Sequence, residues 1–164
     1  MPQLSPEERR DLLKRLNAVQ GYLHLGMPMD AWEELECIPA ENRARPEVLK
    51  IRVDVCRALE KWELVAEVTR HLAKLEPEDS RHIINHAAAV RMMKGEQVAA
   101  DILVNAQRRF PKDAIVAYNL ACYRAATGRV AEAKELLKMA IGFDSSLRSH
   151  SLDDPDLAGL WSSI

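Results

Sequence analysis

Aromatic side chains are scarce in this sequence. Phe, Trp and Tyr together make up 5% of the 164 residues, whereas alanine and leucine are abundant. Sandwiches and barrels are built largely from aromatic and β-branched residues, so this composition favours close-packed helices. No stretch alternates polar and apolar residues for long enough to predict a strand. We therefore expect an all-α protein, and the length suits a single domain over 1–164 with a substantial core.

Long apolar runs and cysteine pairs are also missing. No run approaches the roughly 18 apolar residues that a membrane span requires. The first residues interleave charges with leucines, which is not the apolar core of a signal peptide. Cys37, Cys56 and Cys122 are odd in number and far apart, a pattern typical of small apolar thiols in a reducing compartment. We therefore expect a cytoplasmic protein that has no membrane partner.

The chain lacks a strong charge of either sign. Its 23 lysines and arginines and 25 acidic residues give a formal net charge of −2. A protein without a basic field attracts nucleic acid weakly, so the charge argues against that class of partner. The pairs Arg9-Arg10 and Arg108-Arg109 keep nucleic-acid binding open as a less favoured alternative.

Catalytic and metal-binding motifs are absent too. There is no nucleophile elbow, glycine-rich phosphate loop or paired-carboxylate motif, so we expect neither an enzyme nor a cofactor. His82 and His86 have the spacing that lets two imidazoles share zinc on one helix face, but the metalloprotease glutamate is missing. We expect a solvated His82 and a partly buried His86, with metal binding left open. Asp154 and Asp156 lack the spacing of a calcium loop and are expected to start a helix.

The sequence does contain a series of helical segments. Apolar residues recur at three and four positions, as on one face of a helix, and Ser5-Pro6-Glu7-Glu8 is a typical helix start. Turns are expected at Gly26, Lys61, Gly95 and Gly128, and a polar loop at 40–45. The expected helices are 6–26, 30–38, 46–59, 62–75, 80–94, 97–110, 114–127 and 130–143.

These segments repeat with a period of 34 residues. Pro77 and Pro111 each end a helical hairpin and are 111 − 77 = 34 positions apart. Steps of 34 from the last hairpin back through the chain keep each position apolar or nearly so. The four resulting columns are Ala133, Ala99, Val65, Ala31; Leu137, Leu103, Thr69, Leu35; Ala140, Ala106, Leu72, Ile38; and Ala121, Ala87, Val53, Val19.

A helix–turn–helix period of 34 residues is the signature of tetratricopeptide repeats. The last hairpin resembles that family most closely, with Leu120-Ala121 where the family has Leu-Gly. It departs at Ala117, Arg124 and Ser145, which stand in the usual Trp, Tyr and Pro places. The resemblance covers roughly 12–145, about four-fifths of the chain. Its closing DPDL stretch after a YNLAC-type last repeat is similar to that of bacterial members.

The resemblance implies an all-α, right-handed solenoid of about four repeats, approximately 12–45, 46–79, 80–113 and 114–147. Each hairpin of such a solenoid buries its apolar face against its neighbours, and the end of the array requires a cap. We expect the tail, 148–164, to be this capping helix, with Trp161 against the last repeat. The alternative is that the tail is a mobile or swapped docking peptide.

The resemblance also implies a non-catalytic protein-binding module or scaffold. The first helix of each pair lines the concave groove of these solenoids, and the family holds peptides there. Asparagines in the groove can clamp a peptide backbone, and arginines can pair with a carboxylate through two hydrogen bonds. The first helix of the last hairpin also presents Tyr118 and Cys122. The groove residues that we expect are Gln20, His24, Lys50, Asp54, Arg57, Arg81, Asn85, Arg91 and Asn119. A homo-oligomeric structural or assembly protein is the alternative function.

Overall fold

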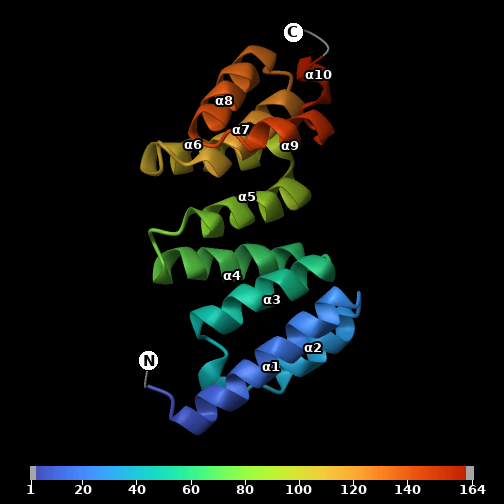
Figure 1. Cartoon of the computed structure of the whole chain (residues 1–164), viewed down its shortest axis with the longest axis vertical. Helices are drawn as coiled ribbons and strands as arrows, with labels where there is room; N and C mark the ends of the chain where they lie inside the picture. The colour runs from blue at the N-terminus through green and yellow to red at the C-terminus, as the bar shows by residue number, and fades with distance from the viewer. Residues whose placement is uncertain (1–2, 162–164) are drawn as a thin grey trace. The chain divides into compact units, whose positions relative to one another are not determined.

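A computed structural model of the chain describes residues 3–161. Within that range the chain forms α-helices, one short 3₁₀ helix and no strand, so the all-α prediction is confirmed (Figure 1). The chain divides into two compact units, unit 1 (Met1–Glu76) and unit 2 (Pro77–Ile164). None of the described helices combines the length and the apolar character that crossing a membrane demands.

Unit 1 consists of two helical hairpins joined by a 3₁₀ turn. Helix α1 pairs with α2, and α3 pairs with α4. The first helix begins where the sequence predicts, because Ser5 and Glu8 form a reciprocal capping box with backbone–side-chain distances of 3.2 and 2.8 Å. The segment 40–45, expected as a plain loop, contains the 3₁₀ helix η1. The elements are α1 (Pro6–His24), α2 (Pro28–Glu36), η1 (Ala40–Asn42), α3 (Pro46–Ala58) and α4 (Trp62–Leu75).

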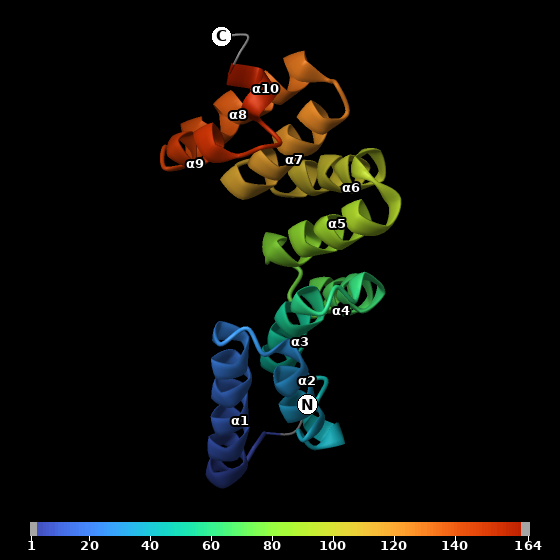
Figure 2. The same cartoon turned by 90° about the vertical axis from the view of Figure 1, so that its right-hand side faces the viewer.

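Unit 2 consists of two further hairpins and a folded tail. Helix α5 pairs with α6, and α7 pairs with α8, while the tail forms two short helices instead of the single expected one. Both views show α9 and α10 beside α7 and α8 (Figures 1 and 2). The elements are α5 (Ser80–Lys94), α6 (Glu96–Arg109), α7 (Ala114–Ala126), α8 (Val130–Phe143), α9 (Leu147–Asp153) and α10 (Ala158–Trp161).

The turns inside the hairpins depend on a left-handed residue. Gly95 and Gly128 have φ of 87° and 76°, values that glycine adopts without steric cost. In the second hairpin this conformation falls on Glu60, with φ of 55°, one residue before the expected position at Lys61. A side chain there costs about 1 kcal/mol relative to glycine, which the packing of α3 on α4 has to offset.

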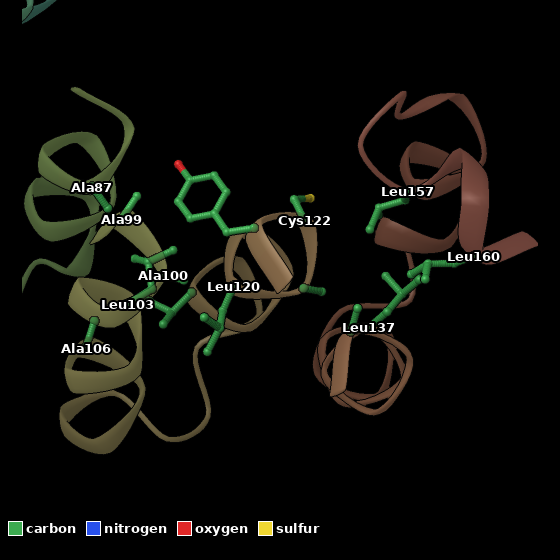
Figure 3. Packing of buried hydrophobic residues seen from close by; sticks show 14 residues of the cluster. Ala87, Ala99, Ala100, Leu103, Ala106, Leu120, Cys122, Leu137, Leu157 and Leu160 are labelled. Carbon is green, nitrogen blue, oxygen red and sulfur yellow. The ribbon is translucent and has the colours of Figure 1, made fainter. Parts of the chain in front are cut away.

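All sixteen positions of the four 34-residue columns are buried. Their exposed fractions range from 0% to 4%, with Leu137 the most exposed. The polar member, Thr69, satisfies its hydroxyl by donating to the carbonyl of Val65 at 2.6 Å. The alanines Ala99 and Ala106 lie inside the core of unit 2, where their small size permits close approach of neighbouring helices (Figure 3). The period therefore predicted the core correctly.

The tail covers the apolar flank of the last hairpin. Leu157 and Leu160 are 0% and 1% exposed and belong to the same buried cluster as Leu137 (Figure 3). Trp161 packs against this cluster and donates its indole N–H to the carbonyl of Ser151 at 2.8 Å. Burial of two leucines stabilises the docked tail by about 1.5–3 kcal/mol each as an upper estimate. The predicted capping role of the tail is confirmed.

Replacement of Ala133 by leucine tests the core column. Ala133 is fully buried, so the larger side chain should overpack α8 and lower the free energy of unfolding by about 1–3 kcal/mol. The urea midpoint should fall while the slope of the transition stays constant. Ala131→Leu, at an exposed position of the same helix, is the matched control and should change stability by at most about 0.5 kcal/mol. Equal midpoints for both variants would contradict the packing.

Candidate functional site

The candidate site lies on the first helices of the two hairpins in unit 2. Arg91 is in the last turn of α5, and Tyr118 and Cys122 lie one turn apart on α7, so they share a face. The turn between α9 and α10, with the sequence Asp154-Pro155-Asp156-Leu157, lies over these side chains. Cys122 is on the side of α7 that faces Leu157 (Figure 3).

Two aspartates of the tail make the polar contacts of the site. Arg91 donates from both terminal nitrogens to the two carboxylate oxygens of Asp156, at 2.7 and 2.9 Å. Tyr118 donates its hydroxyl to Oδ2 of Asp154 at 2.7 Å, and the Cys122 thiol lies 3.6 Å from the same oxygen. The backbone N–H of Asp156 donates to Oδ1 of Asp154 at 2.9 Å. Each oxygen of the two carboxylates therefore accepts at least one hydrogen bond.

Arg91 is held in place from two further sides. Its guanidinium carbon lies 5.1 Å from the centre of the Tyr123 ring, a cation–π distance. Its Nε lies 3.5 Å from the carboxylate of Glu96, just beyond the Gly95 turn. A guanidinium fixed by a ring and a second acid loses less side-chain entropy when it binds a carboxylate with two hydrogen bonds. Arg91 is therefore held by the Tyr123 ring and by Glu96 in addition to its pair with Asp156.

Burial and the aspartates shift the titration of the groups around the tail turn. The hydrogen bonds to Asp156 raise the pKa of Arg91 above its usual value. Burial, reinforced by the hydrogen bond to Asp154, raises the pKa of Tyr118. Burial, with the negative charges of Asp154 and Asp156, raises the pKa of the Cys122 thiol. Arg91 is consequently a cation at neutral pH, and Tyr118 and Cys122 keep their protons.

Three of these groups have the spacing of metal ligands, but their carboxylate oxygens already accept hydrogen bonds. Cys122, Asp154 and Asp156 each place a ligand atom within 4.8 Å of the others, a geometry that a metal ion can use. The two oxygens of Asp156 already accept hydrogen bonds from Arg91, which a metal would have to displace.

The expected groove residues of unit 1 lie on α1 and α3. Gln20 and His24 are exposed in the second half of α1, and Asp54 and Arg57 are exposed one turn apart on α3. Burial raises the pKa of Asp54, with Arg57 acting in the opposite direction. Lys50 is half-buried and pairs with Glu76 at 2.8 Å.

The expected groove residues of unit 2 lie on α5 and α7. Arg91 makes the bidentate carboxylate pair that its side chain allows, with Asp156 of the same chain. Arg81 is 75% exposed and pairs with Asp79 at the start of its own helix, at 2.6 Å. Asn119 donates to the carbonyl of Ile115 at 2.8 Å within α7. Asn85 is half-buried on α5.

The expectation for one of the two histidines was wrong. His82 is only 3% exposed, and its Nε2 lies 3.6 Å from Oδ2 of Asp79. His86 is half-buried, as predicted. Among residues 3–161, no group of candidate metal ligands contains both histidines.

The partners of Arg91 were not predicted from the sequence. Asp154 and Asp156 were expected to begin a helix, but they form the turn that precedes α10. Arg91 and Asp156 are 65 residues apart in the chain, a separation that helical periodicity does not detect. Tyr123 was not singled out either, because its position on α7 predicts only burial, and its ring is 3% exposed.

Thiol labelling should report whether the tail covers α7. Cys37 is exposed, whereas Cys56 and Cys122 are buried and have raised pKa values. Iodoacetamide at pH 8 should therefore modify Cys37 rapidly, and the other two thiols only after unfolding in urea. Peptide mass spectrometry identifies the labelled residue. Labelling of Cys122 as fast as that of Cys37 would show that the docked tail turn is not the populated state.

The start of α5 should be sensitive to acid. The hydrogen bonds from Arg81 lower the pKa of Asp79 from 3.8 to about 2. Because the folded pKa is depressed, the ionised carboxylate stabilises the fold above about pH 4, and this contribution is lost as the pH falls towards 2. The urea midpoint of the wild type should exceed that of Asp79→Asn at pH 6, and the difference should shrink between pH 4 and pH 2. A pH-independent difference would contradict this assignment.

Comparison with known proteins supports the fold directly. No protein-family model matches the sequence, and no curated protein matches it. MamA from Desulfovibrio magneticus RS-1 is similar in structure with a TM-score of 0.66 and 19% identity, over 87% of this chain and 78% of MamA. For a second MamA crystal structure the TM-score is 0.67 and the identity 14%, over 82% of this chain and 79% of that one. For PilF of Pseudomonas aeruginosa the TM-score is 0.72 and the identity 18%, over 96% of this chain and 70% of that one.

MamA and PilF are both tetratricopeptide-repeat proteins. Their likeness to this chain concerns the arrangement of its helices. The chain has the fold of a tetratricopeptide-repeat solenoid, as its 34-residue period predicted.

Proposed function

We propose that the chain is a non-catalytic protein-binding module that holds a segment of a partner protein on the first helices of its hairpins. This proposal rests on one observation, the binding of the tail turn to side chains of α5 and α7. There a non-helical stretch of chain is held by Arg91 and Tyr118 through side-chain hydrogen bonds. A surface that binds one such turn in this way has the donors needed to bind another segment with the same acceptors.

The chemistry of these helices favours binding over catalysis. A nucleophilic cysteine needs a lowered pKa, whereas the pKa of Cys122 is raised. A general base needs a pKa near neutrality, and the pKa of Tyr118 is moved further from it. The guanidinium of Arg91 and the hydroxyl of Tyr118 act here as hydrogen-bond donors, and such donors serve to recognise a ligand.

The first helices of unit 1 offer a second surface for a partner. Asp54 and Arg57 on α3 are exposed and carry opposite charges one turn apart, and Gln20 and His24 on α1 are exposed as well. Such side chains can recognise a polar segment, and the opposite charges fix its direction. We include this surface in the proposed binding site.

A charge swap on α3 tests the proposal. Tagged wild type, Asp54→Lys/Arg57→Glu and Glu67→Lys/Arg70→Glu would be crosslinked in a lysate of the native organism, and captured proteins identified by mass spectrometry. Glu67 and Arg70 have the same spacing and are exposed on α4, a second helix, so they are the matched control. Partners retained by wild type and control should be depleted at least about tenfold with the α3 variant. Identical sets of partners for all three proteins would contradict the proposal.

A further inference from the structure

The tail turn makes two kinds of contact, polar and apolar. Asp154 and Asp156 provide the polar half, through Tyr118 and Arg91. Leu157, the next residue, provides the apolar half, since it is fully buried in the cluster that contains Cys122 and Leu137. An Asp-x-Asp-Leu stretch is therefore recognised by a cation, a hydroxyl and an apolar recess at fixed spacing.

The polar contacts of the tail turn are not needed to cap the last hairpin. Covering an apolar flank takes buried leucines, and Leu157 and Leu160 supply them. Desolvating an arginine and two carboxylates costs free energy that their attraction only partly returns, so such groups contribute more to specificity than to stability. Arg91 also contacts the Tyr123 ring and Glu96, so Asp156 is not its only partner. Arg91 thus selects for an acidic group at the position of Asp156, and Tyr118 donates to an acceptor at the position of Asp154.

The geometry of the donors defines the ligand further. The two nitrogens of Arg91 bind two oxygens of one carboxylate, and an amide offers one acceptor oxygen in their place. Tyr118 keeps its proton, so its hydroxyl donates to an acceptor oxygen, which in this chain is Oδ2 of Asp154. The side chains of Arg91 and Asp156 are each 28% exposed, so the ion pair borders solvent, where a competing segment can reach it.

We propose that the α5–α7 surface of unit 2 binds an acidic Asp-x-Asp-Leu segment of a partner protein, and that the chain's own tail occupies this site as a competitor. This inference rests on the proposed function and adds the chemistry of the ligand. A tethered segment has an effective concentration on the order of millimolar, so a partner segment has to exceed that competition. Only molecules whose site is not occupied by the tail can bind a partner. The apparent affinity for the partner is therefore the intrinsic affinity multiplied by the fraction of such molecules.

A peptide titration of the full chain tests the inference. The probe is a fluorescein-labelled peptide with the sequence of 152–161, LDDPDLAGLW, and the control peptide is LDNPNLAGLW, which lacks the two charges. The protein variant Asp154→Asn/Asp156→Asn weakens the competing tail and leaves its leucines in place. Fluorescence anisotropy at constant ionic strength measures the dissociation constants.

We expect the Asp154→Asn/Asp156→Asn protein to bind the acidic peptide about tenfold or more tightly than the wild type does. It should prefer the acidic peptide to the control peptide by a similar factor. Adding Arg91→Gln should weaken binding of the acidic peptide by roughly ten- to a hundredfold, as expected for loss of a charge-assisted hydrogen-bonded pair. Arg91→Lys keeps the charge without the paired donors and should give an intermediate value.

Cysteine labelling places the bound peptide and verifies the fold. In the Asp154→Asn/Asp156→Asn protein, Cys122 should react faster than in the wild type, and a saturating acidic peptide should restore its protection. Cys56 lies in the core of unit 1 and should stay unreactive in every variant, which shows that the chain remains folded. Cys37 is exposed and serves as the internal reference for the labelling rate.

Several outcomes would overturn the inference. These are equal affinity of the variant for the acidic and control peptides, unchanged binding with Arg91→Gln, and absence of binding by the Asp154→Asn/Asp156→Asn protein up to millimolar peptide. In each case the tail turn is a cap only. The crosslinking experiment on α3 depends on other residues, so partners that are lost with Asp54→Lys/Arg57→Glu would still support the proposed function.

Discussion

The fold depends on the burial of apolar helix faces that no single hairpin can cover. In unit 2 the small side chains of Ala99 and Ala133 bring the helices close enough to share a core, and the same requirement continues to the last hairpin. The outer flank of that hairpin is covered by Leu157 and Leu160 of the tail. The tail has to follow this path because leaving its leucines and the flank in water would forfeit several kcal/mol of burial.

The path of the tail decides what happens to the first helices. To bring Leu157 into the core after α9, the chain has to turn, and the turn carries Asp154 and Asp156 across α7 towards Arg91. The apolar contacts supply most of the adhesion, since they are non-directional and large. The polar contacts determine which sequence fits, since hydrogen bonds are directional and an unmatched buried donor is costly. Capping and recognition therefore use different atoms of the same turn.

The sequence predicted the parts of this structure that repeat. A period of 34 residues samples the same local environment four times, so each buried column is supported by four positions, including Thr69 with its satisfied hydroxyl. Local details that occur once were not predictable in this way. The left-handed residue at Glu60 depends on how α3 meets α4, because a non-glycine residue adopts that conformation only when packing imposes it.

The site was predicted in part, and the division has a physical cause. Arg91, Tyr118 and Cys122 follow from their positions on first helices, which the helical period places on one surface. The tail turn that contacts these residues does not follow from the sequence, because an aspartate–proline–aspartate stretch is equally compatible with a helix start and with a turn. The choice is made by Leu157, whose burial requires the turn.

The two units offer different chemistry to a partner. On α3 of unit 1, the exposed side chains of Asp54 and Arg57 present both charges. On α5 and α7 of unit 2, the protein side supplies donors, while the acids come from the tail. A ligand that satisfies Arg91 and Tyr118 has to be acidic, and next to Asp54 the same carboxylates would meet like charge. The first helices of the two units are therefore expected to select different segments, although their backbones repeat the same hairpin.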